Sequence, residues 1–213
     1  MKTKIRNRQF NAEFRAVEDT ENNKKTIIGR PVVYDKKANL GYFEEIIERG
    51  ALNGADLSDV FLFVNHDISK IPLARSKKDS ESTMRIKIDN EGLSIEADLD
   101  IENNSDAKNL YSAIKRGDIT GMSFMFSVGD EEWENIDSDF PTRRIKKISS
   151  IAEVSAVCFP IYSETEINAR DRTDLENARK KVINKKEEEK RNSINKDLEL
   201  EKLKIKFLYG GNI

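Results

Sequence analysis

The sequence predicts a mainly β protein of the α+β class, in which flanking helices accompany a mixed sheet or a small barrel. Strand-like patterns follow one another through the first three quarters of the chain, where only one segment has a clear helical pattern. This order favours a mixed sheet or small barrel over alternating βαβ units. Near Asn168 the composition changes to dense Lys, Arg, Glu and Asp with few apolar residues. We therefore expect a folded domain over residues 1–168 and a charged extension, helical or disordered, over residues 169–213.

The composition limits the core and the classes of partner. The 213 residues suffice for one sizeable domain plus an extension, or for two small domains, and the chain is 36% charged and 37% hydrophobic. A net charge of -2 gives no reason to expect nucleic acid or an anionic membrane as a partner. The single cysteine excludes an intrachain disulfide and a zinc site of the cysteine and histidine type. No long apolar run follows the basic residues 1–8, so we expect neither a secretory signal nor a membrane span.

Alternation of apolar and polar residues predicts the first strand, with its apolar positions at Phe10, Ala12, Phe14 and Ala16. A polar turn separates it from a second strand, Thr26–Tyr34, and the pair predicts an antiparallel hairpin. Pro31 cannot donate to a ladder, so we place it near an edge or bulge. A short strand is expected at Tyr42–Ile47. Two glycines within Glu48–Leu57 allow at most a short helix there.

The continuous apolar run Val60–Val64 predicts a strand that is buried on both faces. It ends abruptly in Asn65-His66-Asp67, and polar residues at the end of a buried strand are a common place for a functional site. Residues 72–76 continue as extended chain. Two further strands, Ser82–Asp89 and Gly92–Leu99, are expected to form a hairpin around the turn of residues 89–92.

The segment Asn103–Arg116 is the best helix candidate in the first two thirds of the chain. Ser105 is the expected N-cap and Gly117 the stop signal. Its apolar stripe comprises Leu110, Ala113 and Ile114. The chain then enters a strand at Ile119–Val128, makes an acidic excursion, and returns along a long strand at Arg143–Phe159.

The strand Ile119–Val128 has one wholly apolar face, formed by Met122, Phe124, Phe126 and Val128. The other face carries Ser123, Met125 and Ser127. A serine at mid-strand, backed by a packed apolar face, is held as rigidly as a nucleophile needs to be. The alternative is an ordinary serine on a solvated face.

A serine nucleophile needs a base, a group that orients the base, and donors for the developing oxyanion. His66 is the only histidine and so the only candidate base of its kind. Glu153 lies in the middle of an apolar strand, where a carboxylate is costly unless it is paired. Alternatively, Glu153 is an edge-strand charge that faces water. Asp67 could also orient His66, but neighbouring side chains at a strand end usually diverge.

Other chemistries receive less support from the sequence. Cys158 is an alternative nucleophile with His66 as its base, but its strand position predicts a small buried hydrophobe. Asp67, Glu44 and Glu45 hint at a metal site without any ligand spacing to support one. We therefore expect no metal and no other cofactor.

Four motifs in a fixed order resemble the prohead proteases of tailed phages, which are capsid-maturation serine proteases related to herpesvirus assemblins. The motifs are Asn65-His66-Asp67, Leu73-Ala74-Arg75, Gly117-Asp118-Ile119-Thr120-Gly121-Met122-Ser123-Phe124, and Glu153-Val154-Ser155 with Pro160 behind it. The resemblance runs from about Phe10 to Asn168. It implies a small herpesvirus-protease-like β-barrel with flanking helices, with His66 as base, Ser123 as nucleophile and Glu153 as orienting acid.

The resemblance also implies a biological role. Such endopeptidases act inside the assembling procapsid in the host cytoplasm, and cut scaffold or the scaffolding segment of the major capsid protein, and often themselves. The herpesvirus relatives add the expectation of a homo-oligomer, a dimer. Members often have glycine at the positions of Met125 and Ala74, which bears on substrate preference and on the oxyanion hole, for which backbone amides near Arg75 are candidates. The competing hypothesis is a non-catalytic capsid scaffold or chaperone that acts through its charged extension.

Overall fold

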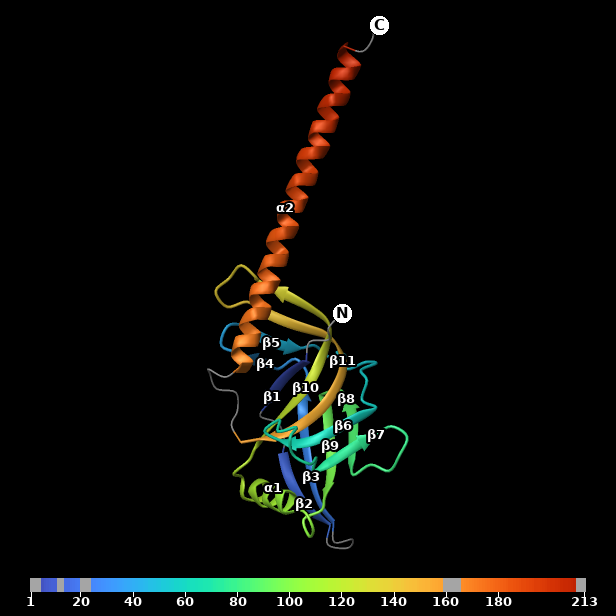
Figure 1. The fold of residues 1–213 in the computed structure, drawn as a ribbon, viewed down its shortest axis with the longest axis vertical. Coiled ribbons are helices and arrows are strands. Elements are labelled where there is room, and N and C mark those ends of the chain that lie inside the picture. Colours follow the sequence, from blue (N-terminus) through green and yellow to red (C-terminus); the bar gives the residue numbers. More distant parts are fainter. Residues whose placement is uncertain (1–4, 11–13, 20–23, 159–165, 210–213) are drawn as a thin grey trace.

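The computed structural model describes residues 5–10, 14–19, 24–158 and 166–209 (Figure 1). These residues form two β-sheets and two helices, so the predicted mainly β, α+β class is confirmed. The two sheets do not close into a barrel within these described ranges, and the predicted barrel is therefore wrong. The apolar faces are covered by placing one sheet on the other, which removes the need for closure.

The larger sheet has seven strands and is built around a long hairpin. Its strands are β1 (Ile5–Phe10), β10 (Gly121–Glu134), β11 (Thr142–Val157), β5 (Glu44–Ile47), β4 (Lys37–Asn39), β6 (Asp59–Val64) and β7 (Ala74–Lys77). β10 and β11 are antiparallel, and β1 continues the sheet beyond β10. The other edge of β11 pairs in parallel with β5 near its start and with β6 near its end.

The smaller sheet contains the two hairpins that the sequence predicts. Its four strands, in spatial order, are β2 (Phe14–Asp19), β3 (Lys24–Val33), β9 (Gly92–Leu99) and β8 (Met84–Asp89). β2 pairs antiparallel with β3, and β8 with β9. The register of β3 against β9 shifts between Gly29 and Val32, which is the bulge expected around Pro31.

Three local predictions need correction. The alternation at Phe10–Ala16 suggested one strand, but Phe10 ends β1 and Phe14 begins β2, in different sheets; Ala12 lies outside the described residues. Helix α1 (Ser105–Arg116) is capped by Asn104 rather than Ser105, because the Asn104 side chain accepts from the backbone of Asp106 and Ala107. The segment after β5 forms turns instead of a short helix, and its Gly50 and Gly54 adopt positive φ.

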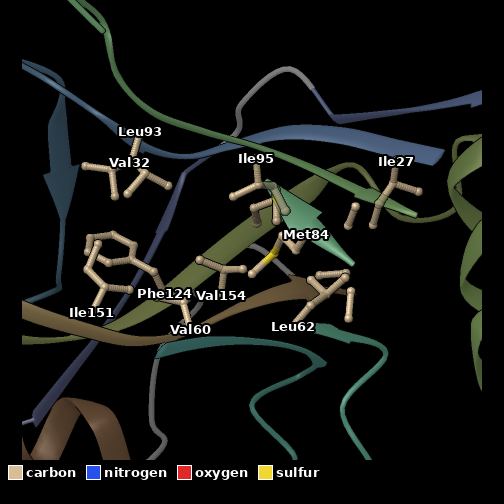
Figure 2. Packing of buried hydrophobic residues seen from close by; sticks show 14 of the residues in the cluster. Ile27, Val32, Val60, Leu62, Met84, Leu93, Ile95, Phe124, Ile151 and Val154 are labelled. Atoms are coloured by element: carbon tan, nitrogen blue, oxygen red, sulfur yellow. The ribbon is translucent and has the colours of Figure 1, made fainter. Parts of the chain in front are cut away.

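The core lies between the two sheets. In Figure 2, Ile27, Val32, Leu93 and Ile95 of the smaller sheet face Phe124, Val154, Val60 and Leu62 of the larger one. All of these side chains are buried. The predicted apolar face of the strand through Ser123 thus points into the core, while Val128, its last member, is only partly buried. Burial of these side chains provides the main stabilisation, at about 25 cal/mol for each Å² of apolar surface removed from water.

Helix α2 (Glu166–Tyr209) is one continuous helix of 44 residues. It extends well beyond the sheets, and its far end lies at the end of the molecule opposite α1 (Figure 1). Leu175, near its start, packs against Leu40 and Phe43 in a small apolar cluster that also contacts Trp133. The extension is therefore helical throughout its described length.

A buried ion pair lies close to this cluster. Arg143 and Glu45 each expose 1% of their side chains, and Arg143 Nη1 lies 3.0 Å from Glu45 Oε2. Arg143 Nε also donates to Glu131 at 2.8 Å, and the guanidinium lies 5.7 Å from the centre of the Trp133 ring. Removal of Glu45 would leave the buried Arg143 with the partly exposed Glu131 as its remaining carboxylate partner.

We expect Glu45→Ala to lower the free energy of unfolding by about 1–3 kcal/mol, because a buried Arg143 N–H loses its acceptor while Glu131 still pairs with the guanidinium. The double substitution Glu45→Leu with Arg143→Met should recover most of that loss. Urea unfolding followed by fluorescence measures this directly, since Trp133 is the only tryptophan and contacts the pair. The control is Glu187→Ala on exposed α2, which should change stability by less than about 1 kcal/mol. Equal effects of Glu45→Ala and Glu187→Ala would contradict the prediction.

Candidate active site

Strand pairing places three polar side chains on one face of the larger sheet. In the antiparallel β10–β11 ladder, Ser123 lies opposite Ser155, and Met125 lies opposite Glu153. Side chains of directly opposed residues project on the same face, and alternation keeps i and i+2 together. Ser123, Glu153 and Ser155 therefore share a face, and the intervening residues point into the core.

His66 reaches this face through a tight turn after β6. The parallel register of β6 with β11 sets Val64 beside Ala156, and the Asn65 backbone N–H donates to the Ala156 carbonyl at 2.9 Å. Asn65 and His66 then both adopt the left-handed conformation, with φ of 51° and 59°. Asparagine and histidine enter this region more readily than most residues, although it still stores strain. The turn directs the chain back over the end of β11.

The imidazole of His66 connects Ser123 to Glu153. Its Nε2 lies 2.6 Å from Ser123 Oγ, and its Nδ1 lies 2.5 Å from Glu153 Oε1. An ionised carboxylate can only accept, so Nδ1 carries the proton that it donates to Glu153. Nε2 is then free to accept the hydroxyl proton of Ser123. The three residues singled out in the sequence thus form one continuous chain of hydrogen bonds.

All three side chains are shielded from water. Ser123 is 3% exposed and Glu153 is 2% exposed, which excludes the alternatives of a solvated serine and a water-facing carboxylate. The His66 side chain is 16% exposed. A carboxylate at this depth is stable only with partners, and Glu153 has His66 on one oxygen and Ser155 on the other.

Ser155 had no assigned role in the prediction from sequence. It is fully buried, and its hydroxyl donates to Glu153 Oε2 at 2.6 Å. The Ser155 hydroxyl oxygen in turn accepts the backbone N–H of His66 at 3.2 Å. The signal in the sequence is the spacing Glu153-Val154-Ser155, because residues two apart on a strand share a face.

The competing candidates are placed differently. The Asp67 carboxylate accepts from the side chain and backbone of Ser69, and these hydrogen bonds lower the pKa of Asp67, while the His66 imidazole pairs with Glu153. Cys158 is exposed, so the prediction that it is buried is wrong. β11 ends at Val157, and Cys158 therefore lies beyond the alternating strand. Its Sγ accepts from Asn65 Nδ2 at 3.4 Å.

The carboxylates considered for a metal site and the Arg75 amide considered for an oxyanion hole have other partners in the structure. Glu45 binds Arg143, and Glu44 forms an ion pair with Lys37 at 2.9 Å. Across the described part of the chain, no group of three or more His, Cys, Asp or Glu is arranged to hold a metal ion. The Arg75 backbone N–H donates to Thr83 Oγ1 at 2.9 Å, so it is not available to an oxyanion.

The two positions at which family members often have glycine have different surroundings. The Ala74 side chain is 4% exposed and belongs to the core, so it does not narrow an open cleft. Met125 is partly buried and lies beside Glu153 on the face that carries Ser123.

A cavity of about 380 Å³ adjoins the His66 turn. It lies between this turn and helix α1, and both chain neighbours of His66 line it. Its walls are mainly apolar and include Phe63, Leu73, Leu110 and Ile119. Lys70 and Asp106 also line it and form an exposed ion pair at 3.5 Å.

The chain matches a family model described as caudovirus prohead serine protease over residues 10–181. It is 30% identical over 134 residues to the prohead protease of Enterobacteria phage HK97, an alignment that covers 61% of this chain. The chain spans about half the length of that relative, 54%. A solved structure of the bacteriophage T4 capsid assembly protease aligns with 71% of this chain and 98% of its own, at 11% identity and a TM-score of 0.37.

The helices and the extent of the family match complete the comparison. Within the described residues, neither helix combines the length and apolar character that a membrane crossing requires. The family match covers more than half of the chain and includes the hydrogen-bonded residues described above. The chain belongs to the caudovirus prohead serine protease family.

Proposed function

We propose that this chain is a serine endopeptidase of capsid maturation, with Ser123 as nucleophile, His66 as general base and Glu153 as the acid that orients the base. One observation carries the proposal: a single imidazole bridges the Ser123 hydroxyl and the Glu153 carboxylate within hydrogen-bonding distance on both sides. A nucleophile, its base and an orienting group in this order are what acyl transfer by serine requires.

The mechanism follows from the hydrogen-bond directions. Ser123 Oγ attacks the substrate carbonyl carbon while its proton passes to His66 Nε2, and the carbonyl electron pair moves onto oxygen. Glu153 stabilises the resulting imidazolium through Nδ1–H. The imidazolium then protonates the leaving nitrogen as the C–N bond breaks, which leaves an acyl-enzyme. Water, deprotonated by the same imidazole, hydrolyses the ester and restores Ser123.

The proposed substrates are the scaffold, or the scaffolding segment of the major capsid protein, of a tailed phage, cut inside the assembling procapsid in the host cell. Membership of the prohead protease family and the similarity to the HK97 prohead protease support this assignment. The cavity beside the His66 turn supports a peptide substrate, because its apolar walls suit a residue near the scissile bond. A homo-oligomer, specifically a dimer, remains a prediction.

We assign residues 1–168 to the protease domain and residues 169–213 to an extension that associates with scaffold helices and is later removed. Beyond its attachment at Leu175, α2 has exposed apolar side chains on a charged helix. Ile194, Leu198 and Leu203 are 57%, 50% and 63% exposed. Exposed apolar side chains of this kind can be buried against another helix.

Ser123→Ala should abolish covalent labelling by a fluorophosphonate, because the reagent phosphonylates an activated serine with loss of fluoride. Ser127→Ala is the matched control, since Ser127 lies on the same face of β10 and is also buried, at 5% exposure. Gel fluorescence and peptide mass mapping measure the labelling. Unlabelled wild-type protein in a folded, assembled state would favour the competing hypothesis of a non-catalytic scaffold.

Glu153→Gln should reduce the labelling rate by about 10³–10⁴-fold, because the amide no longer stabilises the imidazolium or fixes its tautomer. Glu132→Gln is the control, since Glu132 lies on β10 but is exposed and pairs with Lys146. Thermal unfolding of both variants separates lost activity from lost folding. Labelling of the Glu153 variant at more than about a tenth of the wild-type rate would contradict its proposed role.

Self-processing should shorten the chain at its carboxyl-terminal extension in wild-type protein but not in Ser123→Ala. Intact-mass spectrometry after co-expression with the capsid protein measures this, against the full-length mass of 24.4 kDa. A wild-type chain of the same mass as the variant would argue against removal of the extension by the Ser123 active site.

A further inference from the structure

We infer that Ser155 is a positioning residue that fixes the base and the acid relative to each other; this inference rests on the proposed function. Its hydroxyl oxygen contacts both partners of the His66–Glu153 hydrogen bond. It donates to Glu153 Oε2 at 2.6 Å and accepts the His66 backbone N–H at 3.2 Å. Ser155 is fully buried, so water does not compete for these hydrogen bonds.

The two contacts act on different parts of the site. Glu153 must present Oε1 to the imidazole, and the bond from Ser155 to the other oxygen fixes the rotation of the carboxylate. His66 must hold its backbone in the left-handed region, where φ is 59°. The hydrogen bond that its N–H donates to the Ser155 hydroxyl on β11 favours that conformation over relaxed alternatives.

Ser155 itself is held by strand pairing. It lies opposite Ser123 in the β10–β11 ladder and beside Phe63 in the parallel β11–β6 ladder. Its Cα position is therefore set from both edges of β11. The Ser155 hydroxyl thus positions the base and the acid relative to each other, and strand pairing places Ser155 opposite the nucleophile. This is the preorganisation that acyl transfer demands.

Replacement of a serine with only a structural role would lower stability without a specific loss in the rate of the chemical step. Ser155→Ala removes the donor to Glu153 and the acceptor for His66 while leaving the strand pairing and the three proposed catalytic side chains in place. Small misplacements of reacting groups cost about 100-fold in rate. The loss should therefore appear in the chemical step rather than in binding of the reagent.

The test compares wild type, Ser155→Ala, Ser155→Thr and the buried control Ser127→Ala in the full chain. Saturation kinetics with a fluorophosphonate separate the limiting labelling rate from the half-saturating concentration. We expect Ser155→Ala to lower the limiting rate by about 10–100-fold at an unchanged half-saturating concentration. Ser155→Thr, which keeps the hydroxyl, should recover most of the rate, and Ser127→Ala should label as wild type does.

A second readout does not depend on catalysis. Because His66 is the only histidine, a single imidazole Nδ1–H resonance reports its hydrogen bond to Glu153 by NMR. We expect this resonance to be protected from exchange in wild type, Ser155→Thr and Ser127→Ala, and to broaden or disappear in Ser155→Ala.

The outcomes separate the two proposals. Folded Ser155→Ala with a wild-type labelling rate and an unchanged imidazole resonance would overturn the role of Ser155, as would an equal loss in Ser127→Ala. If the resonance is lost only in Ser155→Ala while wild type is not labelled at all, Ser155 positions His66 as inferred, and the assignment of Ser123 as nucleophile fails instead.

Discussion

The pairing of β11 on both of its edges is the constraint on which the site depends. β10 fixes one edge in antiparallel register and β6 fixes the other in parallel register. Because side chains alternate along a strand, a slip of one residue in either ladder would turn the wrong residues toward His66. Ser123 and Glu153 are 30 positions apart in the sequence, and His66 lies 57 positions before Ser123. The two ladders are what bring them together.

The energetic counterpart of this geometry is a carboxylate held almost entirely out of water. Glu153 is tolerated because both of its oxygens accept hydrogen bonds, from His66 and from Ser155. The strained turn at Asn65 and His66 is tolerated for a similar reason. The Asn65 N–H donates to the Ala156 carbonyl and the His66 N–H donates to the Ser155 hydroxyl, and both acceptors lie on β11. Stabilisation from the surrounding sheet thus offsets the cost of assembling a reactive group of side chains.

The sequence predicted the elements of the site better than their arrangement. A single histidine at the end of an apolar run and a lone glutamate within an apolar strand are local signals, and both identified residues that the structure brings together. The roles of these residues remain proposals. The left-handed turn at His66 and the hydroxyl of Ser155 depend on strand register, which is a long-range property. Cys158 was placed wrongly because alternation says nothing about where a strand ends.

The continuous helix α2 has a consequence for any self-processing. At about 1.5 Å per residue its 44 residues span roughly 65 Å, and its far end points away from the sheets (Figure 1). While it remains helical, its outer turns cannot bend back to the Ser123 of the same molecule. Cleavage there is then a reaction between neighbouring molecules, whose rate rises with crowding. Confinement inside a shell would supply that crowding, so the timing of the cut would be set by packing density.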